Sequence, residues 1–182
     1  EFQKWINGGL QQFFSSKFTQ FSKDDSRIPE LISQIADVTL RGGDRLRPYF
    51  CYLGYLAAGK KRKQDILPIL LALETFHTFA LIHDDIMDGA ELRRGGFTIH
   101  AYFTKNLRTD QSKEQLALSL AILAGDLCFS WSQELWNNKR NRANTLFNQM
   151  CEEVIYGQTQ DVWGMENKSL EDLALMYEKK SG

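Results

Sequence analysis

An apolar segment that ends in a cluster of acids, Glu74 to Gly95, limits what this chain can fold into. In a helix, which turns by about 100° per residue, Asp84, Asp85 and Asp88 fall on one face. At a separation of about 5 Å and an effective dielectric constant near 20, each pair of ionised carboxylates repels by roughly 3 kcal/mol. The acids therefore need a counter-charge, which arginines or metal ions can supply.

The helix that carries these acids is predicted to run from about Gln64 to Met87 and to be buried, because it is apolar on nearly every side. A buried helix with acids at its end is expected to open onto a cavity or onto ions. One partly polar stripe follows the helix in steps of three and four residues: Glu74, His77, Leu81, Asp84 and Asp88.

The rest of the chain predicts an all-α protein, because its apolar residues recur mostly at spacings of three and four and it has only three prolines. Ser169 and Asp172 resemble a capping box that begins a last helix, ending at Lys180. Within another long helix, close helix packing would explain Gly125, and a buried ion pair would explain Asp126. Helices are expected over residues 1–21, 30–40, 49–58, 113–136, from 97 and from 142, and loops or turns over 22–29, 59–64, 106–112 and 137–141.

A second informative stretch, RGGDRLRP, runs from Arg41 to Pro48 and contains two glycines and three arginines. Glycine leaves backbone N–H groups open to close approach, and guanidinium groups bind phosphate oxygens in pairs. Arg41, Arg45 and Arg47 therefore suit a phosphate or diphosphate group. The alternative is an ordinary loop before a solvated helix start.

The acids also indicate which metal the chain would bind. Carboxylates without His or Cys at ligand spacing favour a hard cation such as Mg²⁺, which bridges to phosphates. Because Arg93 and Arg94 follow the acids closely, the ligand is expected to be both metal-bridged and anionic, as a diphosphate is. His83 is predicted to be a packed core histidine.

Composition excludes several function classes. A net charge of −1 argues against nucleic acid as a partner. The three cysteines are far apart and odd in number, which predicts reduced thiols in a cytoplasmic protein. We expect no apolar run that approaches the ~20 residues of a membrane span, and we expect no signal peptide. A soluble protein without stable membrane insertion is therefore predicted.

Five motifs in chain order carry a resemblance to a known family: GGDRLRP, HDDIMDGAELRRG, AGDL, GQTQD and KKSG. Over Gly42 to Gly182 they resemble the trans-isoprenyl diphosphate synthase, or polyprenyl synthetase, family, whose first aspartate-rich motif reads DDxxD and is followed by RRG. The resemblance implies a large bundle of mostly antiparallel helices around a central substrate cavity. Residues 1–182 would be the N-terminal part of a single such domain.

The resemblance also implies a reaction, in which an allylic diphosphate (dimethylallyl, geranyl or farnesyl diphosphate) condenses with isopentenyl diphosphate in the presence of Mg²⁺. Asp84 and Asp88 would bind the metal, and Asp85 would orient them. Gln158, Asp161 and Lys180 would act in catalysis by stabilising the departing diphosphate and the cationic intermediate. The implied substrate-binding residues are Arg45, Arg47, His77, Arg93, Arg94 and Ser181.

Family members control product length with residues just before DDxxD. Ala80 lies one helical turn before Asp84 and is expected to leave the floor of the cavity open. The bulky Phe79 resembles the aromatic residue of short-to-medium-chain synthases, so products of about C15 to C25 are expected. The resemblance further implies a homodimer.

The chain departs from the family pattern at several places. Asp44 stands where the family usually has lysine, Phe97 stands where it often has proline, and Ser181 replaces threonine. The second aspartate-rich motif of the family is absent from residues 1–182, so the isolated fragment is expected to be inactive. One alternative is a non-catalytic subunit of a heteromeric synthase, although such a subunit has no reason to keep a repulsive acid cluster. The other alternative is a terpenoid cyclase. A cyclase does not need two diphosphate pockets, so Arg94 and the Gly42–Arg47 stretch argue against it.

Overall fold

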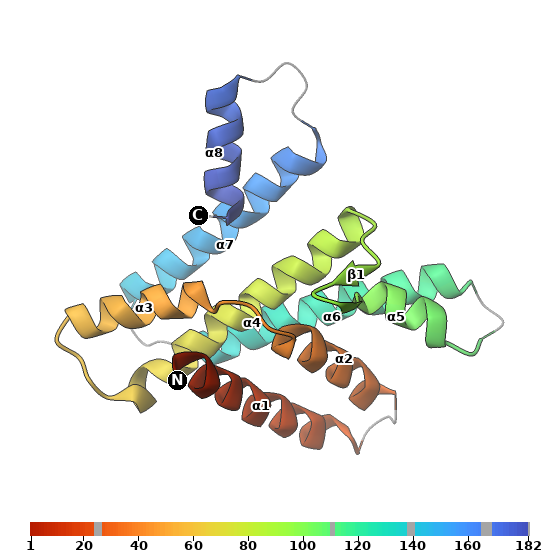
Figure 1. The fold of residues 1–182 in the computed structure, drawn as a ribbon, viewed down its shortest axis with the longest axis horizontal. Helices are drawn as coiled ribbons and strands as arrows, with labels where there is room; N and C mark the ends of the chain where they lie inside the picture. The colour runs from red at the N-terminus through yellow and green to blue at the C-terminus, as the bar shows by residue number, and fades with distance from the viewer. Residues whose placement is uncertain (24–26, 110–111, 138–140, 165–168, 182) are drawn as a thin grey trace. The chain divides into compact units, whose positions relative to one another are not determined.

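The computed structural model describes residues 1–23, 27–109, 112–137, 141–164 and 169–181, and Figure 1 shows their course. These residues form eight α-helices and one short antiparallel sheet, which confirms the all-α prediction. The elements are α1 (Phe2–Phe21), α2 (Ile28–Leu40), α3 (Leu46–Ala57), α4 (Lys63–Met87), β1 (Leu92–Arg93), β2 (Gly96–Phe97), α5 (Ile99–Asn106), α6 (Lys113–Trp136), α7 (Asn141–Val162) and α8 (Leu170–Ser181).

Most helix bounds agree with the sequence prediction to within two residues, and those of α6 agree at both ends. Helix α3 begins at Leu46, earlier than predicted, because Pro48 lies in its first turn, where a missing N–H costs no hydrogen bond. The predicted capping box is confirmed: the Asp172 N–H donates to Ser169 Oγ at 3.1 Å, and the Ser169 N–H donates to Asp172 Oδ2 at 3.0 Å. Parts of the loops predicted over 22–29, 106–112 and 137–141 lie outside the described residues.

The chain divides into two compact units, Glu1–Trp136 and Asn137–Gly182, so its assignment to one domain stays a prediction. In the first unit α4 and α6 pack along each other, while α3 packs on α4, α5 on α6 and α1 on α2 (Figure 1). In the second unit α7 packs against α8.

The core of the first unit lies around α4, as its apolar sequence predicts. Leu70 and Ile82 of α4 are almost fully buried, and each such side chain contributes roughly 1.5–3 kcal/mol. Lys17 of α1 is also buried, at 7% exposure, and pairs with Glu134 of α6 at 2.6 Å. Its ammonium lies 5.8 Å from the centre of the Trp131 ring, a cation–π contact that helps to join α1 to α6.

Two helices correct the expectation about membrane spans. Helices α4 and α6 are each long and apolar enough to cross a membrane, so the expectation that no apolar run approaches that length is wrong. Within the protein, 50% of the most apolar window of α4 and 39% of that of α6 are buried. Core helices of soluble proteins show the same pattern, so the two helices are only a weak indication of a membrane.

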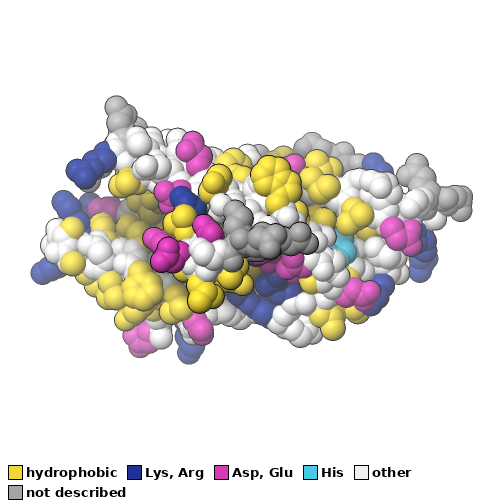
Figure 2. Space-filling model, turned by 90° about the horizontal axis from the view of Figure 1, so that it is seen from above, with side chains coloured by type: hydrophobic (Ala, Val, Ile, Leu, Met, Phe, Trp, Pro, Cys, Tyr) yellow, Lys and Arg dark blue, Asp and Glu magenta, His cyan; other side chains and the backbone are white. Residues whose placement is uncertain are grey.

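The surface carries no single dominant charge on the face that Figure 2 displays, where hydrophobic side chains lie among acidic and basic ones. All three cysteines are free thiols, as predicted. Burial raises their pKa values, that of Cys151 to about 11, so none is a ready thiolate at neutral pH.

Candidate functional site

The acid cluster (Asp84, Asp85 and Asp88) lies at the carboxyl end of α4, and its members differ in exposure. Asp88 follows the helix and is exposed, Asp84 is partly buried, and the Asp85 side chain is only 3% exposed. The counter-charge that the sequence demands is Arg93, whose Nε donates to Asp85 Oδ1 at 2.7 Å and whose Nη2 donates to Asp84 Oδ2 at 3.3 Å. Burial nevertheless raises the pKa of Asp85, although the Arg93 hydrogen bond opposes that rise.

Two of the three acids in the cluster are suited to bind a hard cation. Asp84 and Asp88 lie one helical turn apart, and their carboxylate oxygens are the ligand type that Mg²⁺ prefers. Asp85, because it is buried and bonded to Arg93, is suited to hold its neighbours in place and not to reach an ion. Among the described residues, no three His, Cys, Asp or Glu side chains converge on one point. Asp85 is thus buried against Arg93, whereas Asp84 and Asp88 are more accessible.

A hairpin that the sequence prediction missed presents Arg93 and Arg94. Strands β1 and β2 pair antiparallel, and the two residues between them, Arg94 and Gly95, both have positive φ (50° and 76°). This is the backbone of a tight two-residue hairpin turn. The turn sends the two arginines to different partners, because Arg93 contacts the acid cluster whereas Arg94 Nη1 donates to the Gly42 carbonyl at 2.8 Å.

The glycine–arginine turn (residues 41–45) meets this hairpin although 52 residues separate them. Arg41 pairs with Asp37 and donates to the carbonyl of Phe97 at 2.8 Å. Gly43 has φ +102°, and a Cβ there would lie 2.8 Å from Nη1 of Arg94. A side chain at residue 43 would strain the backbone, and it would also force the Arg94 guanidinium to move.

The structure corrects the interpretation of Arg45 as a substrate ligand. Arg45 is 5% exposed, and its guanidinium forms an ion pair with Glu74, which is 3% exposed. The sequence prediction missed Glu74 as its partner, although an acid within an apolar helix was a signal that a buried cation lies nearby. In this conformation Arg45 is directed into the protein and away from a ligand.

His77 follows Glu74 by one helical turn and lies where the arginines converge. Burial, together with the positive charges of Arg47, Arg94, Arg45 and Arg93, lowers its pKa to about 3. His77 is therefore neutral at pH 7. Four guanidinium groups act on this one imidazole, of which Arg45 is paired with Glu74 and Arg93 with the acid cluster, while Arg94 and Arg47 are the groups suited to an anion.

Two expectations about α6 have opposite outcomes. Close packing at Gly125 is confirmed, because a Cβ there would lie 2.2 Å from Nε2 of His83. The prediction of a buried Asp126 is wrong, because its side chain is 61% exposed; its Oδ1 lies 3.9 Å from Nε2 of His83. His83 itself is 20% exposed and lies at the edge of the core, not within it.

Phe79 and Ala80, the residues expected to set product length, lie on α4 before the acid cluster. The Phe79 ring belongs to an aromatic group, with ring centres 5.4 Å from Phe76, 4.8 Å from His83 and 5.2 Å from Phe129. Ala80 is half-buried.

In the second unit, the structure brings together two of the residues expected to act in catalysis. Lys180 Nζ lies 2.5 Å from Asp161 Oδ2, and Gln158 lies one turn before Asp161 on α7. The side chain of Ser181 lies outside the described part of the chain.

Comparison with known proteins gives one consistent result. Residues 29–182 match the family described as polyprenyl synthetase. The chain is 31% identical over 180 residues to a short chain isoprenyl diphosphate synthase of Methanocaldococcus jannaschii, covering 95% of this chain and 49% of that protein. It is 34% identical over 146 residues to a farnesyl diphosphate synthase of Bacillus subtilis, covering 77% of this chain and 47% of that protein.

The fold has a similar match among solved structures. It superposes on a geranylgeranyl pyrophosphate synthase of Corynebacterium glutamicum, complexed with isoprenyl diphosphate and magnesium, with a TM-score of 0.90 and 26% identity. The match covers 98% of this chain and 55% of that one, which confirms the predicted fold class. The chain thus spans about half the length of the relatives that it matches.

Proposed function

The chain belongs to the polyprenyl synthetase family, and on this premise we propose that it is the N-terminal part of a short-to-medium-chain trans-isoprenyl diphosphate synthase. The full-length protein would condense an allylic diphosphate, such as dimethylallyl, geranyl or farnesyl diphosphate, with isopentenyl diphosphate. The observation that carries the proposal is the pair of arginines on one hairpin: Arg93 contacts the acid cluster, and Arg94 contacts the glycine–arginine turn beside His77.

This arrangement supports the proposal of two diphosphate positions. Arg93 and the acid cluster would hold the allylic diphosphate, with Asp84 and Asp88 as the residues that bind Mg²⁺. Arg94, Arg47 and His77 would hold isopentenyl diphosphate, and neutral His77 would offer a hydrogen bond there without adding charge. When bound, Mg²⁺ supplies positive charge to the diphosphate that leaves.

Ionisation of the allylic C–O bond leaves a diphosphate anion and an allylic cation. The arginines bind the developing anion more strongly than they bind the ground state, and this difference lowers the barrier. Lys180, Asp161 and Gln158 would stabilise the departing diphosphate and the cation. The double bond of isopentenyl diphosphate then forms the new C–C bond with the cation. We further propose a cytoplasmic homodimer.

The deciding experiment uses the full-length protein with Mg²⁺, isopentenyl diphosphate and a labelled allylic diphosphate, and sizes the products. Elongation is expected. If no allylic primer is elongated, the proposal fails, and the alternative of a non-catalytic subunit of a heteromeric synthase is favoured. One observation supports that alternative: the carboxylate of Asp44 lies close enough to Arg94 to act on its pKa.

The effect of Asp44 can be tested directly. Asp44→Lys removes a negative charge beside Arg94 and adds a positive one, so the KM for isopentenyl diphosphate is expected to fall. Because residue 44 is exposed and screened by solvent, the decrease should be about three- to tenfold. Steady-state kinetics against each substrate measure it. The control is Asp65→Lys, which makes the same charge change at an exposed site near the start of α4; an equal effect there would show that Asp44 has no local role.

The product-length assignment predicts a second change. Phe79→Ala removes a ring from the aromatic group before the acid cluster, and the space left should admit a longer chain. Products longer by one or more isoprene units are expected by chromatography of the dephosphorylated alcohols. Phe18→Ala, at a ring that is 45% exposed on α1, serves as the control. An unchanged product distribution would remove Phe79 from this role.

A further inference from the structure

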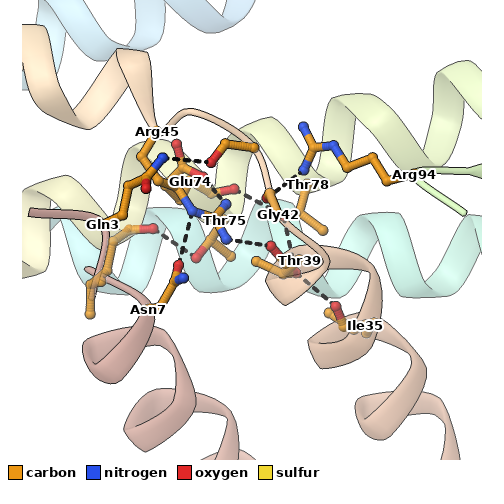
Figure 3. Close-up of polar contacts among 12 residues, drawn as sticks. Gln3, Asn7, Ile35, Thr39, Gly42, Arg45, Glu74, Thr75, Thr78 and Arg94 are labelled. Carbon is orange, nitrogen blue, oxygen red and sulfur yellow. Dashed lines mark hydrogen bonds and ion pairs between the residues drawn. The ribbon is translucent and has the colours of Figure 1, made fainter. Parts of the chain in front are cut away.

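Arg45 is the residue on which several separate segments of the first unit converge. It begins α3 with a left-handed backbone, φ 53° and ψ 37°, a conformation that is unfavourable for a residue with a side chain. Figure 3 shows its guanidinium between α1, α2 and α4. Nε donates to Asn7 Oδ1 at 3.0 Å, Nη2 donates to the Thr39 carbonyl at 2.7 Å, and Nη1 pairs with Glu74.

The partners of Arg45 are themselves held in place. Thr78 Oγ1 lies 3.1 Å from Thr39 Oγ1 and 3.0 Å from the Glu74 carbonyl, while Thr39 Oγ1 donates to the Ile35 carbonyl at 2.7 Å. All of these groups are buried, so their hydrogen bonds are strong and their loss is costly. The end of α2 and the middle of α4 are thereby fixed to the first residue of α3.

The segment that this network closes is the glycine–arginine turn. Both sides of the turn are anchored: the end of α2 before it by the hydrogen bond from Arg45 to the Thr39 carbonyl, and its last residue, Arg45, by the ion pair with Glu74. Between the two ends, the Gly42 carbonyl accepts the hydrogen bond from Arg94, and Gln3 Nε2 donates to the Gly43 carbonyl at 3.4 Å (Figure 3). Two glycines with positive φ leave the turn flexible by itself, so its shape depends on the anchors.

We propose that Arg45 and Glu74 are positioning residues for isopentenyl diphosphate: their buried ion pair fixes the turn that holds Arg94 and that leads into Arg47. The proposal rests on the proposed function and adds to it two residues that do not touch the substrate. A buried ion pair contributes little net stability compared with apolar residues of the same size. Apolar residues at these two sites could not position the turn, because they can form neither the ion pair nor the hydrogen bond to the Thr39 carbonyl.

The test uses the full-length protein and the double variant Arg45→Met/Glu74→Met. Because the substitution removes both charges together, no buried charge is left unpaired and the variant is expected to fold, with a melting temperature lowered by the loss of the Arg45 hydrogen bonds to the Thr39 carbonyl and Asn7. The KM for isopentenyl diphosphate should rise about tenfold, a change that corresponds to one lost or misplaced hydrogen bond. The KM for the allylic diphosphate should change by less than about twofold, since Arg93 is held by the acid cluster.

Lys17→Met is the matched control, because it removes a buried cation that pairs with Glu134 and has no contact with the turn. It should leave both KM values unchanged even if it lowers the melting temperature. Should the double variant fail to fold, Asn7→Ala decides: it removes one of the three guanidinium contacts without leaving an unpaired buried charge, and it should raise the same KM about threefold.

The results separate two failures. If the wild-type protein elongates and the folded variants keep its KM for isopentenyl diphosphate, or raise both KM values equally, the positioning role is wrong and the proposed function stands. If the wild-type protein does not elongate any primer, the proposed function fails and the positioning role fails with it.

Discussion

Asp84→Ala in the full-length protein is expected to lower kcat by about 1,000-fold or more, because it removes a carboxylate that would bind Mg²⁺ where the diphosphate leaves. The structure adds a second reason. Asp84 Oδ2 accepts a hydrogen bond from Arg93 at 3.3 Å, so the substitution also loosens the arginine that would hold the allylic diphosphate. Single-turnover kinetics with saturating substrates measure the effect without a contribution from product release.

The control for this experiment is Asp65→Ala, which deletes an exposed carboxylate from the start of the same helix. Its kcat should stay within about twofold of the wild-type value, as surface substitutions usually allow. A similar kcat for Asp84→Ala and the wild-type protein would contradict the assignment of the acid cluster to catalysis. A loss of helicity in Asp84→Ala would point to folding instead, and circular dichroism detects it.

Gly157→Ala is expected to have the second-largest effect, because α7 and α8 touch at this glycine. A Cβ there would lie 2.5 Å from the Lys180 backbone nitrogen and 2.9 Å from the Lys179 carbonyl carbon. Backbone atoms cannot move aside singly, so α8 must shift, at a cost of about 1–3 kcal/mol of stability. The shift would separate Lys180 from Asp161, now 2.5 Å apart, and kcat should fall about 100-fold.

Thermal melting and steady-state kinetics on the same protein distinguish the two parts of this prediction. The control is Gly8→Ala, at a helical glycine of α1 with no other atoms within 4 Å of the added Cβ. Alanine there should raise the free energy of unfolding by about 0.5–1 kcal/mol, because it favours the helix. If Gly157→Ala is as stable and active as the wild-type protein, the close approach of α8 at this point is not needed for function.

The long helices and the acid cluster were predictable from the sequence because each depends on local pattern. Helix α6 has many turns of apolar spacing, and its bounds agree at both ends. The hairpin was missed because strands of two residues are too short to show an alternating pattern. Its tight turn nevertheless decides which arginine contacts Asp84 and which contacts Gly42.

The errors at Arg45 and Asp126 have a common physical cause, since burial of a charged residue depends on distant partners. Three arginines in one short stretch look alike in the sequence, and only the position of Glu74 on another helix shows that Arg45 points inward. Asp126 follows a glycine that packs closely against His83. Its own side chain is rotated by about 100° round the helix from that contact and reaches solvent. Periodicity alone does not specify which neighbour covers which face.

The contact of Arg93 with Asp84 and Asp85 has a consequence for how the newly made polypeptide matures. In zinc fingers the binding of metal supplies the free energy of folding, so the nascent chain must wait for its ion. Here the chain carries its own counter-ion, eight residues from Asp85 on a hairpin that closes locally. Closing this contact requires only residues that are near one another in the chain, so the polypeptide itself partly neutralises the repulsion between Asp84 and Asp85.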